Sequence, residues 1–214
     1  MGTFFTYAGD YWPGMLVTIE VTILSFVIGM ALGCVVAVCR VSPVRPLRAF
    51  GSVYVELFRN TPLLVLLFIL FFGFPKIGLT WSGFTTAIIG LALYTGAYAG
   101  EILRSGLNTV PAGQAEAARA VGLSFGAVMA EVVLPQAIRS VVPPLGSLFL
   151  AMIRNSAVVS VVAVTDLVKV GDNVVTNKAG AFDATLGVMV GYLILTVPTA
   201  LVVKQLERRA EIAR

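Results

Sequence analysis

Five long apolar stretches constrain this chain more than any other feature of its sequence. Each approaches the roughly 20 residues that a helix needs to cross the hydrocarbon core of a bilayer. They cover residues 15–39, 52–74, 84–103, 141–164 and 185–203. Only 12% of the 214 residues are charged, roughly half the share that is usual in soluble domains. The sequence therefore predicts an all-α membrane protein with about five transmembrane helices, formed by a single domain over residues 1–214.

Positive charges predict the orientation of these helices. Loops rich in Lys and Arg stay on the cytoplasmic side of a membrane. Here the basic residues gather between the first and second stretches, between the third and fourth, and after the fifth: Arg40, Arg45, Arg48, Arg104, Arg119, Arg139, Lys204, Arg208, Arg209 and Arg214. We therefore expect the N-terminus outside and the C-terminus in the cytoplasm. Because the net charge of +4 follows the loops, it argues against a nucleic-acid partner.

Three of the five stretches carry two glycines four residues apart. Such pairs let helix backbones approach closely in lipid, where packing replaces the hydrophobic effect as the driving force. One match has little weight in a chain with 21 glycines. Three matches favour tight packing of helices within or between subunits, at Gly29 and Gly33, Gly96 and Gly100, and Gly187 and Gly191.

The hairpin, residues 109–135, is a long polar segment between the third and fourth stretches. Residues 114–121 are strong helix formers, and Gly122 suits the turn that ends such a helix. Ser124 can cap a second helix, which we expect Pro135 to end. The apolar stripe of that second helix consists of Phe125, Val128, Met129, Val132 and Val133.

Two roles are open for the first helix of the hairpin. A helix that lies on the membrane surface favours Lys or Arg on one face and bulky apolar residues on the other. This helix instead combines small alanines with Gln114, Glu116 and Arg119, which we expect to project into the cytoplasm. The composition therefore favours insertion into a groove of a partner protein.

The hairpin resembles the EAA loop of the permease subunits of ABC importers, in the sequence EAARAVGLSFGAVMAEVVLPQA. Other segments are similar to the polar amino-acid uptake subfamily, namely YVELFRNTPLL, LYTGAYAGEILRSGLNTVPAGQAEAA and LPQAIRSVVPPLG. The resemblance extends from about residue 15 to the fifth stretch. Within the family the chain looks most like actinobacterial glutamate permease subunits, which share RVSPV, RNTPL and GQAEAAR.

The resemblance implies a type I ABC importer permease fold in the bacterial cytoplasmic membrane. It implies a pair of permease subunits, formed by two copies of this chain or by this chain and a relative, with two ATPase subunits and an external substrate-binding protein. The hairpin would be the coupling helix that sits in a cleft of the ATPase, through Gln114, Glu116, Ala117, Ala118, Arg119 and Gly122. ATP and Mg²⁺ would bind the partner, since none of the four lysines here is followed by the Ser or Thr of a phosphate-binding loop.

Ionisable residues occur at the ends of two stretches. Glu56 and Arg59 lie three residues apart, as do Glu101 and Arg104, so each pair can form along one helix face. They either anchor the helix ends at the membrane interface or line the substrate path. Arg59 and Glu101 are candidate path residues, and the resemblance adds Tyr98.

Arg154, Asn155 and Ser156 lie deep within the fourth stretch. A break in the helix is tolerated there only within protein or beside a water-filled cavity. The family usually has Lys-Asp-Thr-Ser-Leu along its translocation path, whereas this chain has RNSAV. An amide in place of the acid suits an anionic substrate. We expect these residues to line the path, and the alternative is that they hold helices together by polar packing.

Two other classes of protein fit the sequence less well. A stand-alone proton- or sodium-coupled carrier needs a carboxylate near the bilayer midplane, but the acidic residues cluster towards the ends of the stretches. An intramembrane enzyme needs a nucleophile and base or a metal site. The chain has no His, and its two cysteines, Cys34 and Cys39, lie on one expected helix. We therefore expect a transport subunit without catalytic residues, metal or cofactor, which imports a polar amino acid, glutamate or a close relative, by alternating access.

Overall fold

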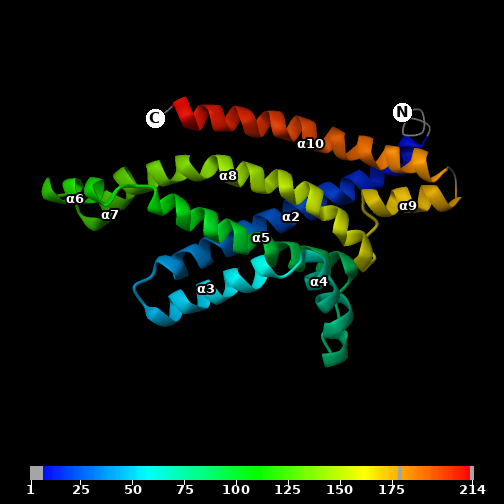
Figure 1. The fold of residues 1–214 in the computed structure, drawn as a ribbon, viewed down its shortest axis with the longest axis horizontal. Helices are drawn as coiled ribbons and strands as arrows, with labels where there is room; N and C mark the ends of the chain where they lie inside the picture. Colours follow the sequence, from blue (N-terminus) through cyan, green and yellow to red (C-terminus); the bar gives the residue numbers. More distant parts are fainter. Residues whose placement is uncertain (1–6, 178–179, 213–214) are drawn as a thin grey trace.

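The structure, a computed structural model, describes residues 7–177 and 180–212, and every regular element in that part is a helix. Five long helices run roughly side by side (Figure 1): α2 (Ala8–Val41), α3 (Arg45–Asn60), α5 (Gly83–Asn108), α8 (Leu134–Asn155) and α10 (Ala181–Ile212). Shorter elements connect or extend them: α4 (Leu63–Phe68), the π-helix η1 (Ile69–Gly73), the 3-10 helix η2 (Phe74–Ile77), α6 (Ala112–Ala120), α7 (Phe125–Ala127), the π-helix η3 (Val128–Val133), the 3-10 helix η4 (Ser156–Val162) and α9 (Leu167–Asn177).

Four continuous helices in the described part are long and apolar enough to cross a membrane: Ala8–Val41, Gly83–Asn108, Phe125–Val162 and Ala181–Ala210. A fifth candidate is a bent pair of helices, described below. The prediction of about five spans is confirmed on this basis. Each of these helices is longer than the corresponding apolar stretch.

The expected second span, residues 52–74, is not one continuous helix. That prediction was wrong because it ignored Pro62, whose ring disfavours the helical conformation in the preceding residue. Thr61 is accordingly extended, with φ −95° and ψ 126°. The helix α3 ends at Asn60, and the segment Leu63–Ile77 departs at 101°. In Figure 1 this segment, labelled α4, points away from the bundle.

Glycines bring α2 and α5 together over most of their length, as the paired spacing predicts. A Cβ atom on Gly33 would lie 2.6 Å from the Cβ of Ala99 and 3.0 Å from the backbone nitrogen of Gly100. One turn along, a Cβ on Gly96 would lie 3.3 Å from the carbonyl oxygen of Gly29. The first two glycine pairs therefore pack against each other. The third pair packs elsewhere, with Gly187 against Tyr11 and Gly191 against Leu167.

Buried apolar side chains form two clusters. One lies where α2, α4, α5, α8 and η4 meet, and its fully buried members include Leu67, Leu91 and Val159. The other joins the start of α2 to α9 and α10, and it contains Tyr11 and Leu167. The Tyr11 hydroxyl also donates a hydrogen bond of 3.0 Å to the carbonyl oxygen of Ala184 on α10. The first half of α2 is therefore fixed to other helices at two levels.

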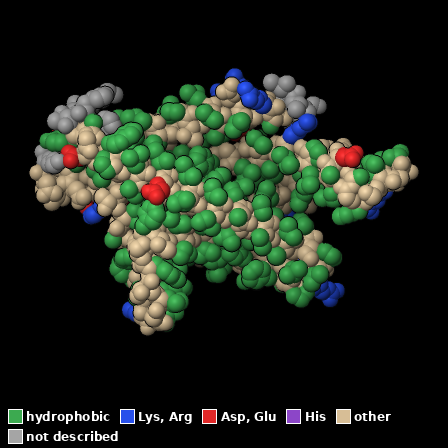
Figure 2. Space-filling view, turned by 180° about the vertical axis from the view of Figure 1, so that it is seen from behind, with side chains coloured by type: hydrophobic (Ala, Val, Ile, Leu, Met, Phe, Trp, Pro, Cys, Tyr) green, Lys and Arg blue, Asp and Glu red, His purple; other side chains and the backbone are tan. Residues whose placement is uncertain are grey.

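Large apolar side chains remain exposed along the long helices. Only 11% of the most apolar window of Ala181–Ala210 is buried within the molecule. Figure 2 shows hydrophobic side chains over most of the middle of one face, with Lys and Arg near its margins. A bilayer or a second chain is the environment that such a surface requires.

Pro135 does not end the second helix of the hairpin, contrary to expectation. The helix runs from Phe125 through α7, η3 and α8 to η4. Pro135 follows directly after the π-helix η3, so its missing N–H falls where the i→i−4 hydrogen-bond pattern is already interrupted. The hairpin is therefore continuous with the fourth span, without a loop between them.

Candidate functional site

The hairpin forms one end of the molecule. In Figure 1, α6 and α7 lie beyond the ends of α5 and α8, on the side where α10 ends. The start of α2 and the helix α9 lie at the opposite end. We call the first the hairpin end and the second the α9 end. The hairpin end also carries Lys204, Arg208 and Arg209 in the last turns of α10.

Gly122 makes the turn between the two helices of the hairpin. Its φ of +90° is in the left-handed region that favours glycine. The N–H of Leu123 bonds to the carbonyl oxygen of Ala118 at 3.2 Å, and that of Gly122 to Arg119 at 2.9 Å. This pair of bonds is a Schellman motif. Ser124 then caps the second helix, as expected, by accepting a bond from the N–H of Ala127 at 3.4 Å.

The candidate coupling residues divide by exposure. Gln114, Glu116, Ala117, Arg119 and Gly122 are exposed. Ala118 is only 8% exposed and lies on a helix that packs against η3. Its small side chain therefore permits the close contact between the two helices of the hairpin, while the exposed residues offer a surface to a partner.

A group of charged side chains lies where α2, α3 and α5 meet. The Glu101 carboxylate accepts a hydrogen bond from Arg40 and a second, of 2.9 Å, from Arg104. Arg59 lies 3.9 Å from the same carboxylate. The expected pair of Glu101 and Arg104 is confirmed. The expected pair of Glu56 and Arg59 does not form, because Arg59 turns towards α5 instead.

Of the three arginines near Glu101, Arg59 lies farthest from its carboxylate. Its side chain is 40% exposed, compared with 15% for Arg40 and 34% for Arg104. Its guanidinium carbon lies 5.2 Å from the centre of the Tyr98 ring, within the range of a cation–π interaction. The Tyr98 hydroxyl accepts a bond of 3.2 Å from Tyr94. This arrangement holds Arg59 in place while leaving donors of its guanidinium available.

These side chains line a cavity of about 400 Å³, which we call the charged pocket. Its lining consists of Arg40, Val55, Glu56, Arg59, Asn60, Tyr98 and Glu101. Three of the candidate path residues, Arg59, Tyr98 and Glu101, therefore meet in one place. Arginine donors and carboxylate acceptors together are suited to a ligand that carries both a carboxylate and an ammonium group.

The other three path candidates lie elsewhere. Arg154 is exposed and lines a separate cavity of about 370 Å³ between α8 and α10. Ser156 is buried and donates a bond of 2.8 Å to the carbonyl oxygen of Ile153. Asn155 is half-buried, and the α-helix changes to a 3-10 helix at Ser156. Within this chain the structure does not bring these residues to the charged pocket.

Arg40 is the residue of the charged pocket that sequence reasoning missed, because it was interpreted only as an orientation signal. A usable signal was present. Gly33 and Gly100 mark the crossing of α2 and α5, Arg40 follows Gly33 by two helical turns, and Glu101 directly follows Gly100. Pairing the two glycine motifs would have placed the two charges together.

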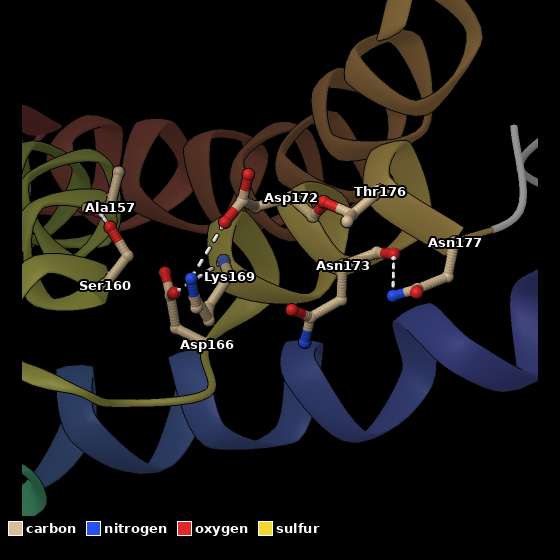
Figure 3. A network of polar contacts seen from close by, with 8 residues as sticks. All are labelled: Ala157, Ser160, Asp166, Lys169, Asp172, Asn173, Thr176 and Asn177. Atoms are coloured by element: carbon tan, nitrogen blue, oxygen red, sulfur yellow. Dashed lines mark hydrogen bonds and ion pairs between the residues drawn. The ribbon is translucent and has the colours of Figure 1, made fainter. Parts of the chain in front are cut away.

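At the α9 end, polar side chains surround the start of α9 (Figure 3). Asp166 is fully buried and accepts a bond of 3.0 Å from the N–H of Lys169. The Lys169 ammonium in turn bonds to Asp172 at 2.8 Å. Burial raises the pKa of Asp166 to about 6, although bonds from backbone N–H groups oppose the shift. The carboxylate therefore caps the start of α9 at an electrostatic cost.

Residues 29–212 match the family of binding-protein-dependent transport system inner membrane components. The chain belongs to this family. It is 39% identical over 201 residues to the probable glutamine ABC transporter permease protein GlnM of Bacillus subtilis, a match that covers 94% of this chain and 93% of the relative. It is 37% identical over 215 residues to the glutamate transport system permease protein GluC of Corynebacterium glutamicum, with 94% of each chain covered.

Solved structures of ABC transporters have the same fold as this chain. An amino acid ABC transporter crystallised with histidines superposes with a TM-score of 0.90 at 32% identity, over 95% of each chain. The MetNI methionine ABC transporter shares the fold, with a TM-score of 0.71 at 23% identity. The chain is therefore a multi-pass permease subunit of the bacterial inner membrane with a type I ABC importer fold, and not an enzyme. The expected family and fold are confirmed.

Proposed function

We propose that this chain forms half of the path by which a polar amino acid, glutamate or a close relative, crosses the inner membrane. A second permease, two ATPase subunits that bind ATP and Mg²⁺, and an external binding protein would complete the importer. The relatives that are permeases for glutamine and glutamate support this substrate class. The basic residues at the hairpin end support an orientation in which the hairpin faces the cytoplasm.

The main support for this substrate class is the set of charged side chains in the charged pocket. Within the lining of the pocket Arg40 and Arg59 balance Glu56 and Glu101, and Arg104, which bonds to Glu101 from outside the lining, adds one positive charge. Glu101 already accepts bonds from Arg40 and Arg104, so Arg59 supplies the uncommitted positive charge. A guanidinium binds a carboxylate through two parallel hydrogen bonds. Arg59 is therefore the group that would hold a substrate carboxylate, and Glu56 the group that would hold its ammonium.

Alternating access gives the hairpin its role. ATP binding would bring the two ATPase subunits together, move the docked hairpins and open the path towards the binding protein. Hydrolysis would reverse the movement. Each ligand shifts this equilibrium only by its different affinity for the two states. In the same cycle Arg154 and Asn155 would line the part of the path that faces the second permease, and Ser156 the point where the helix geometry changes.

Uptake by the reconstituted importer tests the proposal. We expect labelled glutamate or glutamine to enter proteoliposomes faster than arginine. Replacing Arg59 by Ala should lower uptake by about tenfold or more, the effect of losing a hydrogen bond between charged groups. Arg45→Ala, on the exposed start of the same helix, is the control and should leave uptake unchanged. Equal uptake by the two variants would refute the role of Arg59.

A further inference from the structure

Two polar side chains on one face of α8 connect it to neighbouring elements at the hairpin end. Gln136 and Ser140 are four residues apart, so they lie on the same side of the helix. The Gln136 side-chain amide donates hydrogen bonds to the Gln114 side chain on α6 and to the Val132 carbonyl oxygen, the latter at 2.8 Å. Gln136 therefore joins the first helix of the hairpin to the start of the fourth span.

Ser140 makes the corresponding connection to α5. Its hydroxyl lies 3.2 Å from that of Thr109, the residue that follows the last turn of α5. Thr109 donates to the Gly106 carbonyl oxygen at 2.7 Å, and Ser140, whose hydroxyl also donates to Ala137 on its own helix at 2.8 Å, lies 3.5 Å from the Gly106 oxygen. These contacts place the end of α5 against α8 beside Ser140.

The backbones are close at the same level. Gly106 is buried, and a Cβ atom there would overlap the Val141 side chain and lie 3.2 Å from the Ala137 carbonyl oxygen. On the other side, Ala118 is buried in the contact between α6 and η3. Close packing of this kind leaves little room for independent motion. The elements α5, α6 and α8 are thus held together at the hairpin end.

The connection leads to both groups of candidate path residues. The helix α5 carries Tyr98, Glu101 and Arg104, and Glu101 lies less than two turns from Gly106. The helix α8 carries Arg154. A displacement of α6 that reaches both helices would therefore move both cavities, whereas a displacement absorbed within the hairpin would move neither.

We propose that Gln136 and Ser140 are positioning residues that make α6, α5 and α8 move as one unit. The inference rests on the proposed function, in which the ATPase moves the hairpin. The two side chains touch none of the candidate path residues, and on α6 Gln136 bonds to Gln114 and not to Glu116. Their role is to transmit the displacement, so losing them separates ATP hydrolysis from transport without preventing docking.

The measurement is the number of substrate molecules imported per ATP hydrolysed, in proteoliposomes that contain the full importer and its binding protein. The double variant Gln136→Leu, Ser140→Ala removes both connections with little change in size. We expect its ratio to fall about fivefold, the factor that corresponds to loss of one ordinary hydrogen bond. ATPase subunits should still co-purify in wild-type amounts. Ser147→Ala and Gln205→Leu, exposed on α8 and α10, are controls that should keep the wild-type ratio.

A rescue pair separates transmission from simple loss of stability. Gln136→Leu alone should lower the ratio, and Gln136→Glu should rescue it, because its carboxylate can still accept a hydrogen bond from the unchanged Gln114 amide. Equal loss of uptake and ATP hydrolysis, or no rescue, would overturn the inference. An unchanged ratio in the double variant would overturn it while leaving the proposed function intact. A wild-type importer that moves no amino acid would overturn both.

Discussion

Glu101 is surrounded by more positive charge than its own carboxylate neutralises. Arg40 and Arg104 bond to it directly, and Arg59 lies at the edge of the same group. Taking such charges out of water is costly, and apolar residues of similar volume often replace a buried ion pair without loss of stability. A structural requirement alone would therefore not retain four charged side chains here. Binding of a charged substrate gives a reason for their presence.

Asp166 differs from Glu101 in its surroundings. It lies outside the spanning helices, and its carboxylate is buried. One oxygen accepts the bond from Lys169. The other has no hydrogen bond among the described residues, although the Tyr192 hydroxyl is close enough to lower the pKa. Burial nevertheless dominates and raises the pKa from 3.8 to about 6. The folded protein therefore binds this proton more tightly than the unfolded chain.

This difference predicts how stability depends on pH. The raised pKa of Asp166 adds to the free energy of unfolding, and this contribution is fully present below the unfolded pKa of 3.8. It is lost as the pH rises through about 6. A shift of this size corresponds to roughly 3 kcal/mol. The variant Asp166→Asn keeps a capping oxygen but carries no charge. We expect it to raise the melting temperature at pH 7.5 and to remove most of the pH dependence between about pH 4 and 7.

The exposed Asp172 provides the control for that experiment. It pairs with Lys169 on the surface, where its side chain is 61% exposed. Such pairs contribute about 0–1 kcal/mol. Asp172→Asn should therefore change the melting temperature little at either pH. If Asp166→Asn kept the pH dependence of the wild-type protein, another group would have to be its source.

Among the helices, α2 and α5 form the most extensive contact in the described part of the chain. Their buried stripes contain Gly29, Gly33, Gly96 and Gly100. In lipid, such close approach allows dispersion contacts between backbones. The same contact places Arg40 beside Glu101. The glycines thus stabilise the bundle and hold together the two helices that contribute Arg40 and Glu101 to the charged pocket.

Gly33→Leu tests this contact. A Cβ atom there would already lie 2.6 Å from the Cβ of Ala99, so the helices must separate. Overpacking of this kind costs about 1–3 kcal/mol, and we expect a lower melting temperature in detergent. Gly9→Leu on the same helix is the control, since nothing lies within 4 Å of a Cβ there. A normal melting temperature for Gly33→Leu would show that α2 and α5 can separate freely.

Across the whole molecule, the hairpin proposed to receive the ATPase movement and the pocket proposed to bind substrate lie in separate places. The hairpin lies at one end, α9 at the other, and the charged pocket is formed where α2, α3 and α5 meet (Figure 1). The separation requires that a displacement travels through rigid helices. Continuity of η3 with α8, and the contacts of α8 with α5, provide such a route.

Glu116→Lys tests the entry point of that route. Glu116 is exposed on α6, and reversal of a charge at a docked interface costs enough to weaken binding at least about tenfold. We expect the variant to reach the membrane in normal amounts while the ATPase subunit no longer co-purifies. Glu131→Lys, exposed on the second helix of the hairpin, should retain the ATPase. Normal recovery of the ATPase with Glu116→Lys would place its docking surface elsewhere.

Much of the fold was predictable from sequence, because it depends on local composition or spacing. This holds for the membrane class, for the spans other than the second, for the glycine contacts and for the two-helix hairpin. Ser124 and Gly122 have their expected positions for the same reason. The bend at Pro62 was also local, and it was missed only because the apolar run continues across it. Pro135 was misinterpreted because it follows the π-helix η3, where the i→i−4 hydrogen-bond pattern is already interrupted.

The amino-acid sequence by itself determined that this chain enters a membrane and presents a small-residue hairpin at one end, since hydropathy and helix periodicity act within a few turns. Only the tertiary structure decided which charges meet. Arg40, Arg59 and Glu101 come from three helices, and Arg154 proved to line a different cavity. Contacts between distant segments depend on how helices cross and rotate, and those angles arise from packing across the whole bundle rather than from any local pattern.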